Sequence, residues 1–199
     1  MKIVLIGASG TLGKAIEREL APRHEIISVG RNSGAIRADL RNLASLQALF
    51  KSTGSVDAII CAAGSVHFGP WNELTPDKFE IGLSDKLMGQ VNVVLAGQAT
   101  LVDGGSFTLT SGILSEDPIR YGASASLVNG ALESFVRAAA IELPRGQRIN
   151  IVSPTLLEES ADAYGPYFRG YRSVPASEAA LAYSKSVEGA QTGQIYKVW

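Results

Sequence analysis

Lys2-Ile-Val-Leu-Ile6 and Gly7-Ala-Ser-Gly10-Thr-Leu-Gly13 stand directly next to each other at the start of this 199-residue chain. The first segment is a short apolar run typical of a buried strand, and the second is a glycine-rich turn that opens a helical pattern. A turn this tight needs tolerance of positive φ, and its bare backbone lets a pyrophosphate approach the N–H groups and the dipole of a helix N-terminus. The pair therefore predicts dinucleotide binding, through Gly7, Ser9, Gly10, Thr11, Leu12 and Gly13; the alternative is a strand–helix turn with a structural role only.

Short β-branched runs alternate with helical patterns along the rest of the chain, which indicates βαβ units and a parallel sheet. Most of the runs are apolar throughout, as expected for strands covered by helices on both faces. The predicted strands are Lys2–Ile6, Glu25–Val29, Ala35–Ala38, Asp57–Cys61, Ser106–Thr110, Arg148–Val152 and Gln194–Val198. The predicted helices are Thr11–Ala21, Leu43–Ser52, Pro76–Leu101, Ala123–Leu143 and Ala176–Val187. We expect one doubly wound α/β domain spanning residues 1–199, since no repeat or linker interrupts the pattern.

Composition narrows the class of protein. A net charge of −1 and a pI near 6.1 give no reason to expect a nucleic acid or an anionic membrane as partner. The single cysteine, Cys61, cannot form an internal disulfide, and no Cys/His cluster has metal-ligand spacing. No stretch resembles a secretory signal or a membrane span. We therefore expect a cytoplasmic protein without a metal site.

The residues after the second predicted strand bear on the choice of cofactor. NAD-binding folds tend to carry an acid here for the ribose 2′-hydroxyl, whereas an arginine accommodates a 2′-phosphate. This chain has Gly30-Arg31-Asn32 and no Asp or Glu between Val29 and Asp39. The sequence therefore favours NADP(H) over NAD(H), unless Arg31 is only a solvated surface charge.

Several further motifs resemble those of the short-chain dehydrogenase/reductase family, from Met1 almost to the last residue. Gly7 and Gly13 match the outer glycines of the family turn. The resemblance implies a Rossmann-like fold, with Asp39-Leu40 at the adenine ring and the cofactor also contacted by Ala62, Ala63, Gly64, Pro154 and Thr155. Cys61-Ala-Ala-Gly64 stands where the family has Asn-Asn-Ala-Gly, and Asn150-Ile-Val-Ser-Pro154 matches Asn-x-Val-x-Pro.

The catalytic motif is matched only in part. Ser111 resembles the catalytic serine, with Gly112 as the alternative position, and Tyr121-Gly-Ala-Ser-Ala125 matches Tyr-x-Ala-Ser-Lys except for its lysine. Typical members also carry Asn-Leu-x-Gly in the central helix, where this chain reads Lys86-Leu-Met-Gly89. An asparagine has thus become a lysine, while the lysine has become an alanine. The resemblance implies that Tyr121 would donate a proton to a carbonyl compound that Ser111 polarises.

The missing lysine leaves four interpretations open. Without a nearby ammonium, only about 0.1% of a tyrosine with a pKa near 10 is ionised at pH 7, so Tyr121 would be a poor base. In the first interpretation Lys86 supplies the ammonium from another backbone position, and in the second Ser111 and Tyr121 act alone and slowly. In the third the chemistry uses other groups such as His67, and in the fourth the chain binds NADP(H) without catalysis, as a redox sensor or regulatory protein.

Two segments remain open in their role. In the predicted helix Ala123–Leu143 the polar residues Ser126, Asn129, Glu133 and Arg137 form one narrow stripe, and the rest is apolar or small. A helix of this kind is usually buried on more than one side, either within the monomer or in a homodimer or homotetramer. Between Pro154 and Pro175, the family's substrate-covering region, three roles are open for the clustered aromatic residues: they line an apolar pocket, pack onto the protein's own surface, or pack across a dimer. A small carbonyl or alcohol substrate is implied by the resemblance, and no pattern names it.

Overall fold

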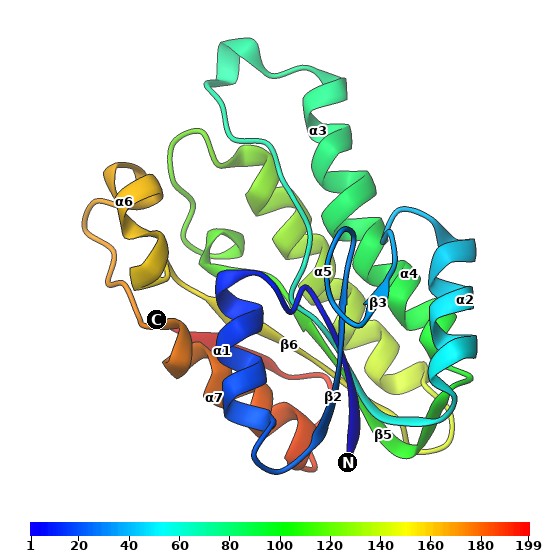
Figure 1. The fold of residues 1–199 in the computed structure, drawn as a ribbon. Helices are drawn as coiled ribbons and strands as arrows, with labels where there is room; N and C mark the ends of the chain where they lie inside the picture. Colours follow the sequence, from blue (N-terminus) through cyan, green and yellow to red (C-terminus); the bar gives the residue numbers. More distant parts are fainter.

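Seven parallel strands form one sheet in the computed structural model, which describes residues 1–199 (Figure 1). The strands are β1 (Lys2–Ile6), β2 (Glu25–Gly30), β3 (Ile36–Arg37), β4 (Val56–Cys61), β5 (Leu101–Thr110), β6 (Arg148–Pro154) and β7 (Ile195–Val198), in the order β3-β2-β1-β4-β5-β6-β7. Strand β1 lies between β2 and β4, with Val4 opposite both Ile27 and Ile59. This arrangement confirms the predicted doubly wound, Rossmann-like α/β fold.

Helices cover both faces of the sheet (Figure 1). One face carries α1 (Thr11–Leu20) and α7 (Ala176–Glu188), whose Ile16 and Tyr183 are fully buried. The other carries α2 (Leu43–Thr53), α4 (Met88–Gly97) and α5 (Ala123–Glu142), which bury a second core. No helix combines the length and the apolar character needed to cross a membrane.

The helix predicted over Pro76–Leu101 is interrupted and ends earlier. The structure has α3 (Pro76–Gly82), a π-helical turn (Leu83–Leu87) and then α4, so that Leu101 begins β5. Leu101 pairs with Val56, and the register shifts before Ser106 pairs with Ala58. The prediction was wrong at this end because pairing with β4, a long-range contact, decides the conformation of the first residues of β5.

Helix α5 places part of its polar stripe inside the protein. Asn129 and Glu133 are buried, whereas Leu127 and Ile141 are exposed. The stripe therefore does not mark a solvent face, and its inner members belong to the site described below.

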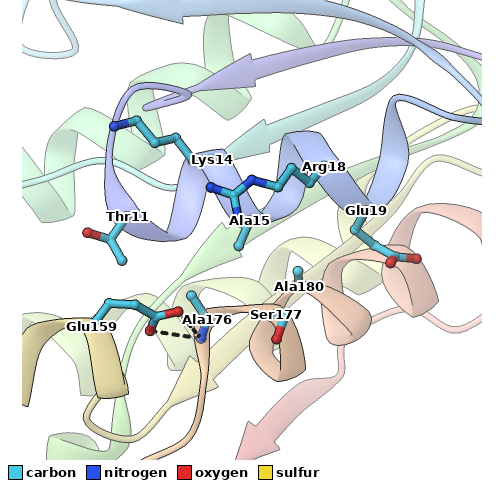
Figure 2. A pocket seen from close by; sticks show the side chains of 9 residues that line it. All are labelled: Thr11, Lys14, Ala15, Arg18, Glu19, Glu159, Ala176, Ser177 and Ala180. Atoms are coloured by element: carbon cyan, nitrogen blue, oxygen red, sulfur yellow. Dashed lines mark hydrogen bonds between the residues drawn. The ribbon is translucent and has the colours of Figure 1, made fainter.

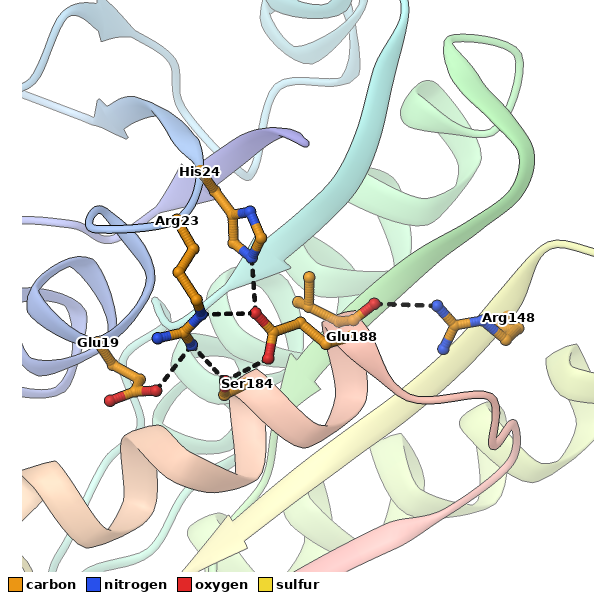
Figure 3. Close-up of polar contacts among 7 residues, drawn as sticks. Glu19, Arg23, His24, Arg148, Ser184 and Glu188 are labelled. Atoms are coloured by element: carbon orange, nitrogen blue, oxygen red, sulfur yellow. Dashed lines mark hydrogen bonds and ion pairs between the residues drawn. The ribbon is translucent and has the colours of Figure 1, made fainter.

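A polar cluster ties the end of α7 to the connection between α1 and β2 (Figure 3). Glu188 accepts hydrogen bonds from Arg23 at 2.9 Å, from Ser184 at 3.0 Å and lies 2.8 Å from the Nε2 atom of His24. The hydrogen bonds, first that from Arg23, lower the pKa of Glu188 to about 2. Because β2 begins at Glu25, this cluster lies at the amino ends of the strands, opposite the edge where the site forms.

Candidate cofactor and catalytic site

A pocket of about 260 Å³ opens at the carboxyl ends of β1, β2 and β4. This is the point where the strand order reverses, and ligands of doubly wound sheets bind in the crevice there. Its lining residues are Ile6, Gly7, Ser9, Gly10, Gly30, Arg31, Ala38, Leu40, Ala62, Ala63, Gly64 and Asp85. Most of the residues predicted to contact a cofactor thus meet in one place.

The glycine turn provides a free anion-binding backbone. Gly7 adopts φ +90°, and a Cβ on Gly13 would overlap the carbonyl oxygen of Gly7, so both positions require glycine. A Cβ on Gly10, in contrast, would meet only one atom within 4 Å. No hydrogen bond within the protein uses the N–H groups of Thr11 and Leu12 in the uncapped first turn of α1. The turn therefore fits the diphosphate of a dinucleotide.

Two charged side chains face each other at the far wall of the pocket. Arg31 is half exposed, and its Nη2 atom lies 3.7 Å from Oδ2 of Asp85, a residue that is only 8% exposed. Asp39, predicted to reach the adenine ring, instead forms a two-point ion pair with Arg41 at 2.9 and 3.2 Å. Hydrogen bonds from Arg41 lower the pKa of Asp39 to about 2. Asp85, rather than Asp39, is the carboxylate that lines the pocket.

The remaining predicted contacts lie outside this pocket. Leu12 packs against the core beneath α1 and α7. Pro154 ends β6, and the hydroxyl of the buried Thr155 donates to the carbonyl of Arg172 at 3.0 Å. Thr11 lines a different and larger groove of about 450 Å³ between α1 and α7, together with Lys14 and Arg18 (Figure 2).

Ser111 follows β5 and is buried against helix α5. Its hydroxyl donates to Oε1 of Glu133 at 2.8 Å, and the hydroxyl of Ser115 donates to the same oxygen at 2.8 Å. Glu133 is only 4% exposed, so this carboxylate is enclosed by its hydroxyl donors. The neighbouring Gly112 offers no side chain. In this arrangement the Ser111 proton is directed at Glu133 rather than at a substrate.

Lys86 reaches from the π-helical turn towards the same region. Its ammonium donates to Oδ1 of Asn129 at 2.7 Å and to the carbonyl of Ser111 at 3.1 Å. Its stem lies against Gly64, where any Cβ would collide with it. Burial lowers the pKa of Lys86 to about 8, with the charge of Glu133 acting in the opposite direction. Ala125, at the family's lysine position, is buried in α5 and brings no charge.

Tyr121 does not join this group. It precedes α5 with φ +68°, a sparsely populated conformation for a residue with a side chain, and it is 43% exposed. Its ring makes an edge-to-face contact with Tyr167, at 6.1 Å between centroids. Its hydroxyl forms no hydrogen bond with Ser111 or Lys86.

The ring of Tyr121 instead lines an apolar pocket of about 300 Å³. The other lining residues are Phe68, Ile119, Ala163, Tyr164 and Tyr167, so no charged side chain takes part. His67 lies beside this region in the loop after β4, and its buried Nε2 atom has no hydrogen-bond partner.

Two residues of the site were missed by the analysis of the sequence. Asp85 gave no signal, because an acid next to Lys86 in a helical stretch is typical of a solvated face. Glu133 was noticed only as a member of the polar stripe. Its spacing of four from Asn129 places both on one face of α5, which was the available signal that the two act together.

Comparison with known proteins agrees with this geometry. A family model described as Enoyl-(Acyl carrier protein) reductase matches residues 8–189. Versicolorin reductase stcU from Emericella nidulans is 30% identical over 156 residues, covering 74% of this chain and 59% of that protein. Short chain dehydrogenase claC from Passalora fulva is 30% identical over 118 residues, covering 57% of this chain and 44% of that protein. The chain thus matches about half the length of these relatives.

Solved structures extend the likeness over the whole chain. The crystal structure of the protein lin1944 from Listeria innocua has a TM-score of 0.98 and 53% identity, with 100% of both chains covered. A small-chain dehydrogenase in complex with NADPH has a TM-score of 0.88 at 23% identity, covering 100% of this chain and 96% of that one, which is a likeness of fold. The chain belongs to the short-chain dehydrogenase/reductase family.

Proposed function

We propose that this protein is an NADP(H)-dependent short-chain oxidoreductase with an altered and slow catalytic site. The observation that carries the proposal is the pocket at the strand-order reversal, where the glycine turn, Arg31 and Gly64 meet. When bound, a nicotinamide cofactor supplies or accepts the hydride, and the substrate is a small carbonyl or alcohol compound.

We further propose a homodimer or homotetramer in the cytoplasm, with the exposed Leu127 and Ile141 of α5 as candidates for the subunit contact.

The preference for NADP(H) over NAD(H) rests on Arg31. Its guanidinium lines the pocket, is half exposed, and is held only by a 3.7 Å contact with Asp85. A guanidinium binds a phosphate through two hydrogen bonds, so a cofactor with a 2′-phosphate gains a partner that one without it lacks.

Lys86 is the best candidate for the missing catalytic cation. Its ammonium is enclosed next to Ser111, where a positive charge favours anionic groups nearby. Ser111 would polarise the carbonyl and Tyr121 would donate the proton, but each must move first: Ser111 away from Glu133, and Tyr121 away from Tyr167. These two movements are the physical reason to expect slow turnover.

The apolar pocket beside Tyr121 supports an uncharged, apolar substrate. Its walls are aromatic or aliphatic, and an ionised substrate would lose hydration there without gaining a partner.

A second candidate function is non-catalytic binding of NADP(H) by a regulatory or redox-sensing protein. The hydrogen bond from Ser111 to the buried Glu133 favours it, because this bond occupies the hydroxyl that catalysis would need.

Calorimetric titration with NADPH, NADP⁺, NADH and NAD⁺ tests the proposal. We expect binding with a preference for the phosphorylated forms, and we expect Arg31→Ala to lose that preference while Arg37→Ala, an exposed arginine of β3, keeps it. Failure of all four to bind would overturn both candidate functions. If NADPH binds, its oxidation by a panel of apolar aldehydes and ketones separates the enzyme from the sensor.

A further inference from the structure

Asp85 is a buried carboxylate in a pocket that is otherwise lined mainly by glycines and small or apolar side chains. It is 8% exposed and shares the pocket wall with Leu40, Ala38 and Arg31. Placing a carboxylate among such neighbours is unfavourable unless hydrogen-bond donors compensate it. A ligand that brings a donor to this wall would therefore be held specifically.

The carboxylate keeps one oxygen unused. Its Oδ2 atom accepts from the N–H of Ser65 at 3.2 Å and is also the atom 3.7 Å from Arg31. No hydrogen bond reaches Oδ1 within the protein, and Oδ1 is not enclosed by protein atoms. The N–H of Ser65 fixes the carboxylate from behind, so Oδ1 remains available to an occupant of the pocket.

The position of Asp85 selects which donor it would meet. The diphosphate fits the glycine turn, and Arg31 follows β2, so this wall belongs to the adenosine end of a dinucleotide. The apolar side chains of Ala38 and Leu40 suit the faces of a flat base rather than a sugar. The donor that adenine carries at its edge is the 6-amino group.

We propose that Asp85 accepts a hydrogen bond from the 6-amino group of adenine and thereby selects adenine over other purines. The proposal rests on the proposed function, because it concerns the same pocket. Asp39 does not line this pocket, and its two oxygens accept hydrogen bonds from Arg41.

Arg31 and Asp85 then act in sequence. Without a ligand they face each other across the base position, and a 3.7 Å pair with a half-exposed arginine is weak enough to separate easily. When the dinucleotide enters, Arg31 turns to the 2′-phosphate and Asp85 is left to the base.

Calorimetry with NADPH and with its hypoxanthine analogue, reduced nicotinamide hypoxanthine dinucleotide phosphate, tests this inference. Hypoxanthine carries a carbonyl in place of the 6-amino group, so it presents an acceptor to the carboxylate. We expect the wild type to bind NADPH about tenfold to a hundredfold more tightly than the analogue, the range of a charge-assisted hydrogen bond. Asp85→Asn is nearly isosteric and offers both a donor and an acceptor, so we expect its two affinities to agree within about threefold.

Asp39→Asn is the control variant for Asp85→Asn, because it alters the other carboxylate near this wall of the pocket. It should keep the discrimination of the wild type. Loss of discrimination in Asp39→Asn but not in Asp85→Asn would overturn the inference, and so would equal affinities in the wild type. Thermal unfolding of each variant without nucleotide checks that it is folded. If the wild type binds neither nucleotide, the proposed function itself fails, whereas tight binding of NADPH without discrimination refutes only the role of Asp85.

Discussion

The two halves of the site lie at the same edge of the sheet but differ in what their side chains face. The proposed cofactor half, made by the glycine turn, Arg31 and the segment 62–64, opens into a pocket, and the N–H groups of Thr11 and Leu12 after the turn have no partner within the protein. The proposed catalytic half is made by Lys86, Ser111 and Tyr121. Lys86 and Ser111 form hydrogen bonds within the protein, and the ring of Tyr121 contacts that of Tyr167. The comparison teaches that one edge of a sheet can combine an open pocket with polar groups that are already bonded within the protein.

The largest effect should come from the cofactor half, in Gly13→Ala. A Cβ there overlaps the backbone of Gly7, so we expect a loss of about 3 kcal/mol in the free energy of unfolding and no detectable NADPH binding. Gly130→Ala in α5 is the matched control. Apart from its own helix backbone, no atom lies within 4 Å of a Cβ at this position, so the change should stabilise the protein by about 0.5–1 kcal/mol. Urea unfolding and calorimetry measure both, and equal stabilities would contradict the close approach.

Glu133→Ala should affect the catalytic half and leave the cofactor half unchanged. The buried hydroxyl of Ser111 and the partly buried hydroxyl of Ser115 lose their acceptor, so we expect a loss of about 2 kcal/mol in the free energy of unfolding with NADPH affinity changed less than about twofold. Glu142→Ala, at the exposed end of the same helix, should stay within about 0.5 kcal/mol of the wild type. A large loss of NADPH affinity in Glu133→Ala would mean that the halves are not independent.

The charge of Lys86, a residue of the catalytic half, should affect binding of NADPH in the cofactor half. Its pKa of about 8 means that the ammonium is present at pH 7 and lost as the pH rises through about 8. We expect the affinity of the wild type for NADPH to fall by up to about tenfold between pH 7 and pH 9.5, and that of Lys86→Met to stay level. Lys51→Met, on the exposed side of α2, should follow the wild type. A level profile in the wild type would remove Lys86 from the cofactor's surroundings.

The smallest effect should lie outside both halves, at Glu188. Its pKa of about 2 is below the ordinary 4.5, so its contribution to stability is present above pH 4.5 and disappears as the pH falls through 2. This side chain is 35% exposed, so solvent weakens its ion pairs, and Glu188→Gln should lower stability at pH 7 by only about 0.5 kcal/mol. The variant should also lose stability less steeply than the wild type between pH 4.5 and pH 2. Glu178→Gln, exposed at the start of α7, should match the wild type in acid titrations followed by circular dichroism.

Local signals made most of the fold predictable, together with the meeting of the glycine turn, Arg31 and the segment 62–64 at one pocket. The strand Lys2–Ile6, the glycine turn and α1 follow one another directly, so their geometry depends on neighbours in the chain. The prediction that Arg31 stands near the pocket also depended on a short connection, since it follows the end of β2 by one residue.

The catalytic half was less predictable because long-range contacts decide it. Ser111 and Glu133 are 22 residues apart, and Lys86 and Asn129 are 43 apart, so no local pattern pairs them. A charged residue in a helical pattern usually indicates a face exposed to solvent, whereas Glu133 is buried. The family motif at Tyr121 predicts a catalytic side chain, yet it does not predict the positive φ that precedes α5.

The π-helical turn Leu83–Leu87 bears on how this chain tolerates insertions and deletions. Such a turn holds one residue more than the α-helical turn it replaces, and one residue advances a helix by about 100°. We expect that removing a single residue from this turn restores a continuous helix from α3 to α4 and leaves both flanking helices intact. It would also turn Asp85 and Lys86, which now face two different parts of the site, away from their present partners. The presence or absence of one residue in this turn thus decides whether Asp85 and Lys86 face the site.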